Sequence, residues 1–182
     1  MRQVSYRLLV LVSTAVLLLD QLTKEIIIRN LELYEALPIL PNFFHITHVR
    51  NQGAAFGILA NHALRLPVLL GASLLAVVGI CWYYRQFPPE RSWLRWGLSL
   101  ILGGAVGNMI DRLRFGAVID FLDVHWYQYH WPAFNVADSA ITIGVCCCWW
   151  IAGDRPAPAT RVRHPEAHDN ASRPVPGYRP SY

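Results

Sequence analysis

The chain has 182 residues, of which 54% are hydrophobic and 15% charged, and it contains seven tryptophans. This composition excludes an ordinary soluble domain of the same length and favours a protein with several membrane spans. The formal net charge of +4 does not indicate nucleic-acid binding, because five of the 16 basic residues lie in a proline-rich tail, residues 154–182. That tail lacks apolar periodicity and is predicted to be a disordered cytoplasmic extension.

The first apolar run covers residues 6–22, and its apolar stretch "LLVLVSTAVLLL" follows Arg2 and Arg7. A basic start and an apolar core also fit a secretory signal peptide. However, no small-x-small cleavage site follows, and the run continues directly into "DQLTK". We therefore predict that this segment remains as the first transmembrane helix.

Three further apolar runs cover residues 66–84, 93–110 and about 136–152. Each is about as long as a helix must be to cross the hydrocarbon of a bilayer, roughly 17 to 20 residues. In the third of the four runs, Ser99, Gly103 and Gly107 form a row of small residues that lets another helix approach closely. The predicted fold class is an all-α membrane protein with four transmembrane helices and a small extracytoplasmic β-sheet and loop region.

The orientation follows from Lys and Arg in the connections, which are enriched on the cytoplasmic side. Ten lie in the N-terminus, the 85–95 connection and the tail, against six in the two other connections. Both termini are therefore predicted to be cytoplasmic, and residues 23–65 and 111–135 to form outward loops of a single domain, residues 1–153. Within the first loop, "NFFHITHVRN" predicts strands of a small sheet on the outer membrane surface.

Polar residues at the predicted helix ends form two groups. Asp20 and Lys24 are four residues apart, as are Asn108 and Arg112, with Asp111 beside the latter pair. Such spacing places side chains on one helix face. Simple ion pairs or caps explain these groups as well as direct contacts in a functional site do.

Asp120 and Asp138 stand next to apolar residues at the outer ends of the third and fourth spans. If "VIDFLDV" is extended, Asp120 and Asp123 point to opposite faces, which favours Asp120 as the partner of Asp138. Two close carboxylates in an apolar setting share a proton, so one can activate water while the other donates. This is aspartic-protease chemistry, although the spacing leaves open a helix cap at Asp138 and a surface strand residue at Asp120.

At these residues the sequence resembles the lipoprotein signal peptidases, also called signal peptidase II. The similarity lies in five blocks that occur in order over about 150 residues: "DQLTK" (20–24), "VRNQGAAFGIL" (49–59), "GNMIDRL" (107–113), "GAVIDFLDV" (116–124) and "FNVADSAI" (134–141). The resemblance implies a bacterial inner-membrane aspartyl endopeptidase. Such an enzyme removes the signal peptide of a prolipoprotein by cutting before a diacylglyceryl-modified cysteine.

The resemblance also implies roles for individual residues. Asp120 and Asp138 would be the catalytic pair. Positions expected to bind substrate or brace the site are Asp20, Lys24, Asn51, Gly53, Asn108, Asp111, Arg112, Asn135 and Ala137. No metal or other cofactor is implied; the expected partners are lipidated prolipoproteins and membrane lipids, a monomer is favoured, and the active site would face the periplasm.

Two other functions compete with this hypothesis. A metalloprotease could use His125 and His130 with nearby acids, or His45 and His48, although no H-E-x-x-H motif occurs. A proton-coupled membrane transporter could use the intramembrane acids, although the chain lacks the internal repeat found in many carriers. The consecutive Cys146, Cys147 and Cys148 cannot form a C-x-x-C site and are interpreted as small apolar helix residues.

Overall fold

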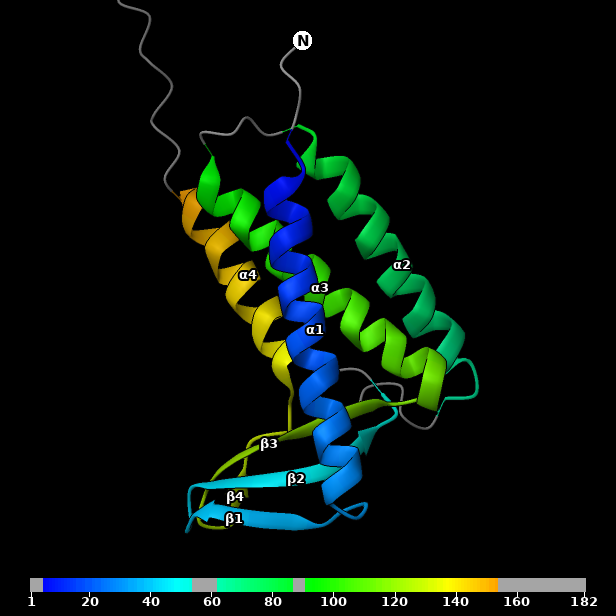
Figure 1. Ribbon diagram of the computed structural model, residues 1–182, viewed down its shortest axis with the longest axis vertical. Helices are drawn as coiled ribbons and strands as arrows, with labels where there is room; N and C mark the ends of the chain where they lie inside the picture. The colour runs from blue at the N-terminus through cyan, green and yellow to red at the C-terminus, as the bar shows by residue number, and fades with distance from the viewer. Residues whose placement is uncertain (1–4, 54–61, 87–90, 154–182) are drawn as a thin grey trace, which may run out of the picture.

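The computed structural model describes residues 5–53, 62–86 and 91–153. Four helices lie side by side, and a small sheet crosses one end of the bundle (Figure 1). The start of the first helix and the end of the last lie at the opposite end of the bundle (Figure 1). The elements, in chain order, are α1 (Arg7–Asn30), β1 (Ala36–Leu40), β2 (Phe44–Asn51), α2 (Arg65–Tyr84), α3 (Ser92–Phe115), β3 (Val118–Trp126), β4 (Tyr129–His130) and α4 (Val136–Gly153).

The four helices correspond to the four predicted apolar runs, but helices α1 and α3 extend well beyond the ends of their runs. Helix α1 runs to Asn30 and α3 to Phe115, so the segments 23–65 and 111–135 begin inside helices rather than as loops. Helix α1 continues because Lys24 and Ile27 keep a buried face beyond the apolar run. Helix α3 is followed by Gly116, which adopts a left-handed conformation with φ of 67° that glycine tolerates at a helix end.

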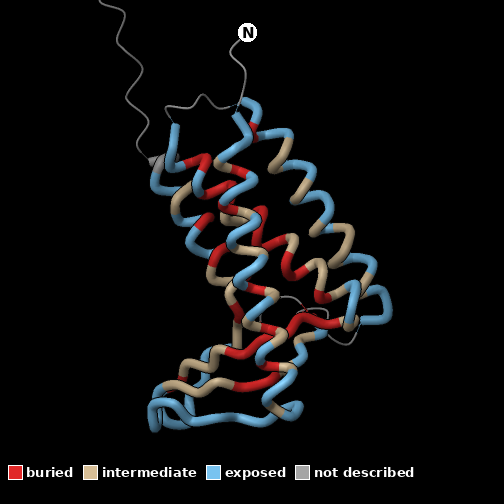
Figure 2. Tube along the Cα trace, in the orientation of Figure 1, coloured by how far each residue is buried: buried red, intermediate tan, exposed pale blue. Residues whose placement is uncertain are grey.

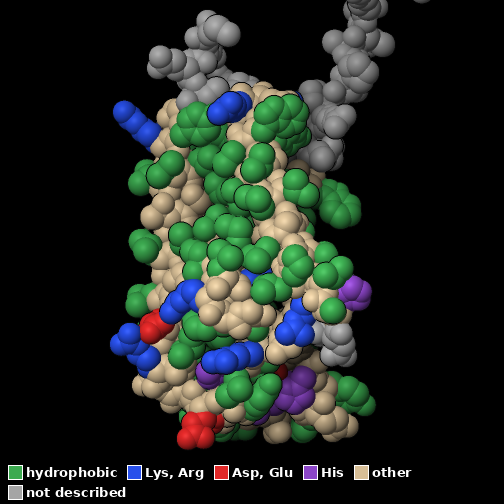
Figure 3. All heavy atoms as spheres, turned by 90° about the vertical axis from the view of Figure 1, so that its right-hand side faces the viewer, with side chains coloured by type: hydrophobic (Ala, Val, Ile, Leu, Met, Phe, Trp, Pro, Cys, Tyr) green, Lys and Arg blue, Asp and Glu red, His purple; other side chains and the backbone are tan. Residues whose placement is uncertain are grey.

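Length and hydropathy distinguish α2 from the other helices. Within the described ranges, α2 alone is both long and apolar enough to cross a membrane by these two criteria, with a mean hydropathy of 2.0. The bundle nevertheless exposes large apolar side chains on other helices too, including Leu11 on α1 and Trp149 on α4. On the face in Figure 3, hydrophobic side chains cover the middle of the helical part, and charged side chains gather toward its ends.

Helix α3 lies at the centre of the bundle and carries most of its buried residues (Figure 2). The row of small residues predicted on it, together with Gly104 beside that row, allows close packing on two sides. A Cβ atom at Gly103 would lie 2.8 Å from the Ser13 carbonyl oxygen of α1, and one at Gly104 would meet the Ala137 carbonyl oxygen of α4. Glycine is therefore required where α3 meets these two helices.

The sheet is antiparallel, with strand order β1-β2-β3-β4. Strands β2 and β3 pair His45 with Asp123 and Asn51 with Val118, with an irregularity between Ile46 and Val49. The small sheet and the extended conformation of residues 118–124 are thus confirmed. The first four residues of β3 are all buried, because this strand passes beneath the ends of the helices (Figure 1).

Candidate active site

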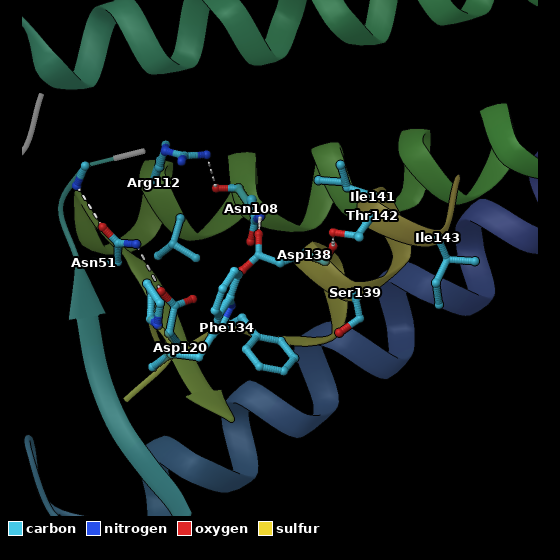
Figure 4. A pocket seen from close by; sticks show the side chains of 15 residues that line it. Asn51, Asn108, Arg112, Asp120, Phe134, Asp138, Ser139, Ile141, Thr142 and Ile143 are labelled. Atoms are coloured by element: carbon cyan, nitrogen blue, oxygen red, sulfur yellow. Dashed lines mark hydrogen bonds between the residues drawn. The ribbon is translucent and has the colours of Figure 1, made fainter. Parts of the chain in front are cut away.

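A cavity of about 590 Å³ opens where the C-terminal end of α3, the start of α4 and the sheet meet (Figure 4). Asp120 enters it from β3, and Asp138 enters it from the first turn of α4. Its lining is mostly apolar apart from these carboxylates and a few amide, hydroxyl and guanidinium groups. The lining residues are Asn51, Gly53, Asn108, Arg112, Val118, Asp120, Trp131, Pro132, Ala133, Phe134, Asp138, Ser139, Ile141, Thr142 and Ile143.

Asp120 is almost fully buried, with 1% of its surface exposed. Its two carboxylate oxygens accept hydrogen bonds from Asn51 Nδ2 at 3.1 Å and from Asn135 Nδ2 at 2.7 Å. Burial, and then the nearby charge of Asp138, raise the pKa of Asp120 to about 7, although the two amide bonds act in the opposite direction. Asp120 therefore exchanges its proton near neutral pH, as an acid–base group requires.

Asp138 is placed by the cap of α4. Asn135 stands immediately before the helix, and its Oδ1 accepts a hydrogen bond from the Asp138 backbone N–H at 2.8 Å. Asn135 is thus the N-cap, and the alternative that Asp138 caps the helix is wrong. The Asp138 side chain instead faces the cavity, where its Oδ1 accepts a hydrogen bond from Asn108 Nδ2 at 2.8 Å (Figure 4).

A buried group of charges lies behind the cavity. Lys24 Nζ lies 2.8 Å from Asp20 Oδ2, 2.8 Å from Asp111 Oδ2 and 3.0 Å from Asn108 Oδ1. The two carboxylates are fully buried, and Lys24 is 2% exposed. Because an ammonium group can only donate, Lys24 fixes the oxygen of the Asn108 amide toward itself and the NH₂ toward Asp138.

The same carboxylates also bind the backbone of neighbouring elements. Asp20 Oδ1 accepts a hydrogen bond from the Ala137 N–H in the first turn of α4 at 2.9 Å. Asp111 Oδ2 accepts one from the Ile119 N–H of β3 at 3.2 Å. The helix and the strand that carry Asp138 and Asp120 are therefore both attached to one buried ionic group.

The structure brings all of the predicted site residues into this one region. Asn51, Gly53, Asn108 and Arg112 line the cavity with the two aspartates, whereas Asp20, Lys24, Asp111, Asn135 and Ala137 lie behind it. The Gly53 N–H donates to Asn51 Oδ1 at 3.0 Å, which orients the Asn51 amide toward Asp120. Asp111 pairs with Lys24 and not with Arg112. Arg112 Nη1 instead donates to the backbone carbonyl oxygen of Asn108 at 3.4 Å.

Two sets of site residues were not predicted. Gln21 Nε2 donates to Asp111 Oδ1 at 2.9 Å and so completes the buried group. The second set lines the cavity from β3 and from either side of Asn135: Val118, Trp131, Pro132, Ala133, Phe134, Ser139, Ile141, Thr142 and Ile143. Helical spacing could have identified Ile141 and Thr142, because both lie one turn after Asp138.

The histidines considered for a metalloprotease lie outside the cavity lining. His45, His125 and His130 form a cluster on the sheet, with ring centroids between 4.2 and 6.5 Å apart, and His45 and His130 contact Asp123. Among the described residues, no group of three or more His, Cys, Asp or Glu side chains is arranged to hold a metal ion.

A helical bundle with an apolar outer surface and a cavity holding two carboxylates has the architecture of a membrane enzyme. Two solved structures described as bacterial membrane enzymes are similar to this chain, with TM-scores of 0.73 and 0.71 and identities of 29% and 32%. Each similarity covers 82% of this chain, and 93% and 94% of the respective solved chains.

The family described as Signal peptidase (SPase) II matches residues 12–152, and the chain belongs to that family. A lipoprotein signal peptidase from Syntrophotalea carbinolica is 59% identical over 145 residues, covering 80% of this chain and 90% of the relative. One from Geobacter metallireducens is 48% identical over 141 residues, covering 78% and 87%. The protein is therefore an aspartic endopeptidase of the membrane, and the transporter alternative finds no support in these similarities.

Proposed function

We propose that this protein removes the signal peptide of diacylglyceryl-modified prolipoproteins, cleaving before the lipidated cysteine, with Asp120 and Asp138 as the catalytic pair. Two carboxylates from separate elements facing one cavity are the observation that carries the proposal. Membership of the signal peptidase II family supports the reaction and the substrate class.

The chemistry needs one ionised and one protonated carboxylate. The ionised member takes a proton from a water molecule, whose oxygen attacks the scissile carbonyl carbon, while the protonated member gives its proton to the carbonyl oxygen. In the second step the carboxyl group that took the water's proton gives it to the cysteine nitrogen, the other carboxylate takes the proton of one hydroxyl of the tetrahedral intermediate, and the C–N bond breaks, which restores the starting state of the pair. The products are a signal peptide with a new carboxyl group and a lipoprotein with a free amino group on its cysteine.

The other polar residues prepare this pair. Asn51 and Asn135 hold Asp120, and Asn108 holds Asp138. Arg112 lines the cavity close enough to both aspartates for an attractive charge interaction, and it is suited to bind a substrate carbonyl group. The remaining predicted residues brace the site: Asp20, Lys24, Gly53, Asp111 and Ala137.

The setting also suits a lipidated substrate. The cavity wall is mostly apolar and lies at the end of the bundle beside the sheet, where acyl chains and a surface peptide can meet. The proposal includes four membrane-spanning helices, cytoplasmic termini, a periplasmic active site in the bacterial inner membrane, and a monomer that works among membrane lipids.

The direct experiment incubates the purified protein in detergent with a precursor peptide that carries diacylglyceryl cysteine. The same peptide without the lipid serves as the matched substrate. We expect a shortened product from the lipidated peptide and much less from the other, because misplacing a scissile bond by about 1 Å can cost roughly a hundredfold in rate.

Variants of the aspartates complete this test. Asp120→Asn and Asp138→Asn keep the side-chain shape but cannot exchange a proton, so each should abolish cleavage while leaving membrane levels normal. Substantial turnover by either variant, or equal rates with and without lipid, would contradict the proposal.

A further inference from the structure

A hydrogen bond outside the cavity joins two strands of the sheet. His130 Nδ1 in β4 lies 2.9 and 3.0 Å from the two carboxylate oxygens of Asp123 in β3. Because an ionised carboxylate only accepts, Nδ1 is the donor. The Asp123 side chain is 14% exposed and that of His130 is 48% exposed, so water screens this bond only in part.

Neighbouring imidazole rings fix the orientation of the pair. His125 stacks on His130 with ring centroids 4.5 Å apart and an angle of 13° between the planes. His45, which is paired with Asp123 across β2 and β3, lies 4.2 Å from the His125 ring and places Nδ1 3.8 Å from Asp123 Oδ2. The His130 ring is therefore held between a stacking partner and a carboxylate.

One wall of the cavity begins at Trp131, the residue after His130. Residues 131–134 all line the cavity, and this wall segment connects β4 to the cap of α4. Backbone hydrogen bonds fasten its ends to β3, from Trp131 N–H to the Val124 carbonyl at 2.9 Å and from Phe134 N–H to the Leu122 carbonyl at 3.1 Å.

Strand β4, which pairs with β3, leads into the start of this wall segment. Strand β4 has only two residues, and both are exposed, so apolar burial contributes little there. A charge-assisted hydrogen bond is roughly twice as strong as a neutral one. The Asp123–His130 hydrogen bond is thus a side-chain attachment at the point where the wall segment leaves the sheet.

We infer that Asp123 and His130 are positioning residues that hold the wall segment, residues 131–134, in the shape that binds substrate. This inference rests on the function proposed above. Neither residue lines the cavity, so the pair acts through the wall segment and not on the reacting atoms. Loss of the pair therefore weakens substrate binding and leaves the chemical step at the two cavity aspartates nearly unchanged.

Steady-state cleavage of the lipidated peptide tests this role. We expect Asp123→Leu and His130→Leu each to raise KM roughly tenfold while kcat changes less than about twofold. His130→Asn restores an N–H donor near the position of Nδ1 and should recover most of the affinity that His130→Leu loses. A general loss of folding would not give this split between KM and kcat.

A double variant and a matched control sharpen the test. Asp123→Leu combined with His130→Leu should be no worse than either single variant, because both remove the same interaction. Glu25→Gln removes a carboxylate from an ion pair on the exposed side of α1, with Arg29 at 2.9 Å, and should leave KM unchanged.

The results separate this inference from the proposed function. If the unmodified protein cleaves the peptide but the Asp123 and His130 variants keep its KM, or lose kcat instead, only the positioning role is overturned. Additive effects in the double variant, or an equal rise in KM with Glu25→Gln, would also overturn it. If the unmodified protein does not cleave the lipidated peptide at all, both proposals fail.

Discussion

Asn108 Nδ2 donates a hydrogen bond to Asp138 Oδ1 over 2.8 Å, and the amide holds this orientation because its oxygen accepts from the buried Lys24. A residue of α3 thereby connects a buried cation of α1 to a carboxylate of α4. The buried ammonium group of Lys24, which lies outside the cavity, therefore fixes the direction of the hydrogen bond from Asn108 to Asp138.

Removal of this bond should slow catalysis. We expect Asn108→Ala to lower kcat roughly tenfold to a hundredfold, because a hydrogen bond to a charged group is typically worth about 1.5 to 3 kcal/mol. Cleavage of the lipidated peptide under saturating conditions measures this. Asn30→Ala, which removes an exposed amide at the end of α1, is the control and should retain normal turnover.

The rate should also fall as pH rises through neutrality. Burial raises the pKa of Asp120 to about 7, so its proton is retained below that pH and lost above it. If this proton is needed at the dyad, kcat/KM decreases above about pH 7. In Asn51→Leu the carboxylate loses a hydrogen bond that lowers its pKa, so the alkaline limb should move to higher pH. A shift to lower pH would contradict this assignment.

Lys24 is predicted to be essential for stability. Lys24→Met leaves Asp20 and Asp111 buried without their cation, and breaking a buried pair in this way typically costs about 3 to 5 kcal/mol. Arg29→Met breaks an exposed pair with Glu25 and should cost at most about 1 kcal/mol. Unfolding in detergent compares the two variants, and equal stabilities would show that the buried charges are not coupled.

Close packing of α3 against α4 gives a prediction at Gly104. A Cβ atom there would meet the Ala137 backbone, so Gly104→Ala must push α4 and Asp138 away, with an expected cost of about 1 to 3 kcal/mol and reduced cleavage. On α2, a Cβ at Gly79 would meet nothing within 4 Å, and Gly79→Ala should be neutral or stabilising by up to about 1 kcal/mol. Thermal unfolding and peptide cleavage distinguish the two.

A strong chelator is expected to leave cleavage intact. Water activated by a carboxylate needs no Lewis acid, in contrast to the zinc-bound water of a metalloprotease. The measurement is the cleavage rate before and after chelation, and then after adding zinc back. Inhibition that zinc reverses would contradict the two-aspartate mechanism and revive the histidine alternative.

Several features were determined by the sequence alone. The four apolar runs predicted the helices, and the extended segment around Asp120 predicted a strand. The order of the five sequence blocks predicted the family. The helices and the strand follow from local properties, because the spacing of apolar residues along a segment reflects the surroundings that each of its faces meets. The glycine at position 116 ends α3 for an equally local reason, because few other residues adopt its left-handed conformation.

Only the tertiary structure decided which groups are partners. The four-residue spacing pairs Lys24 with Asp20, but it does not reveal that Asp111, far along the chain, shares the same ammonium group. Asp111 and Arg112 are adjacent in sequence, yet they face a buried charge and the cavity respectively. Such partners depend on how closely α1, α3 and α4 approach, and that distance is set by backbone contacts at Gly103 and Gly104 rather than by any local preference.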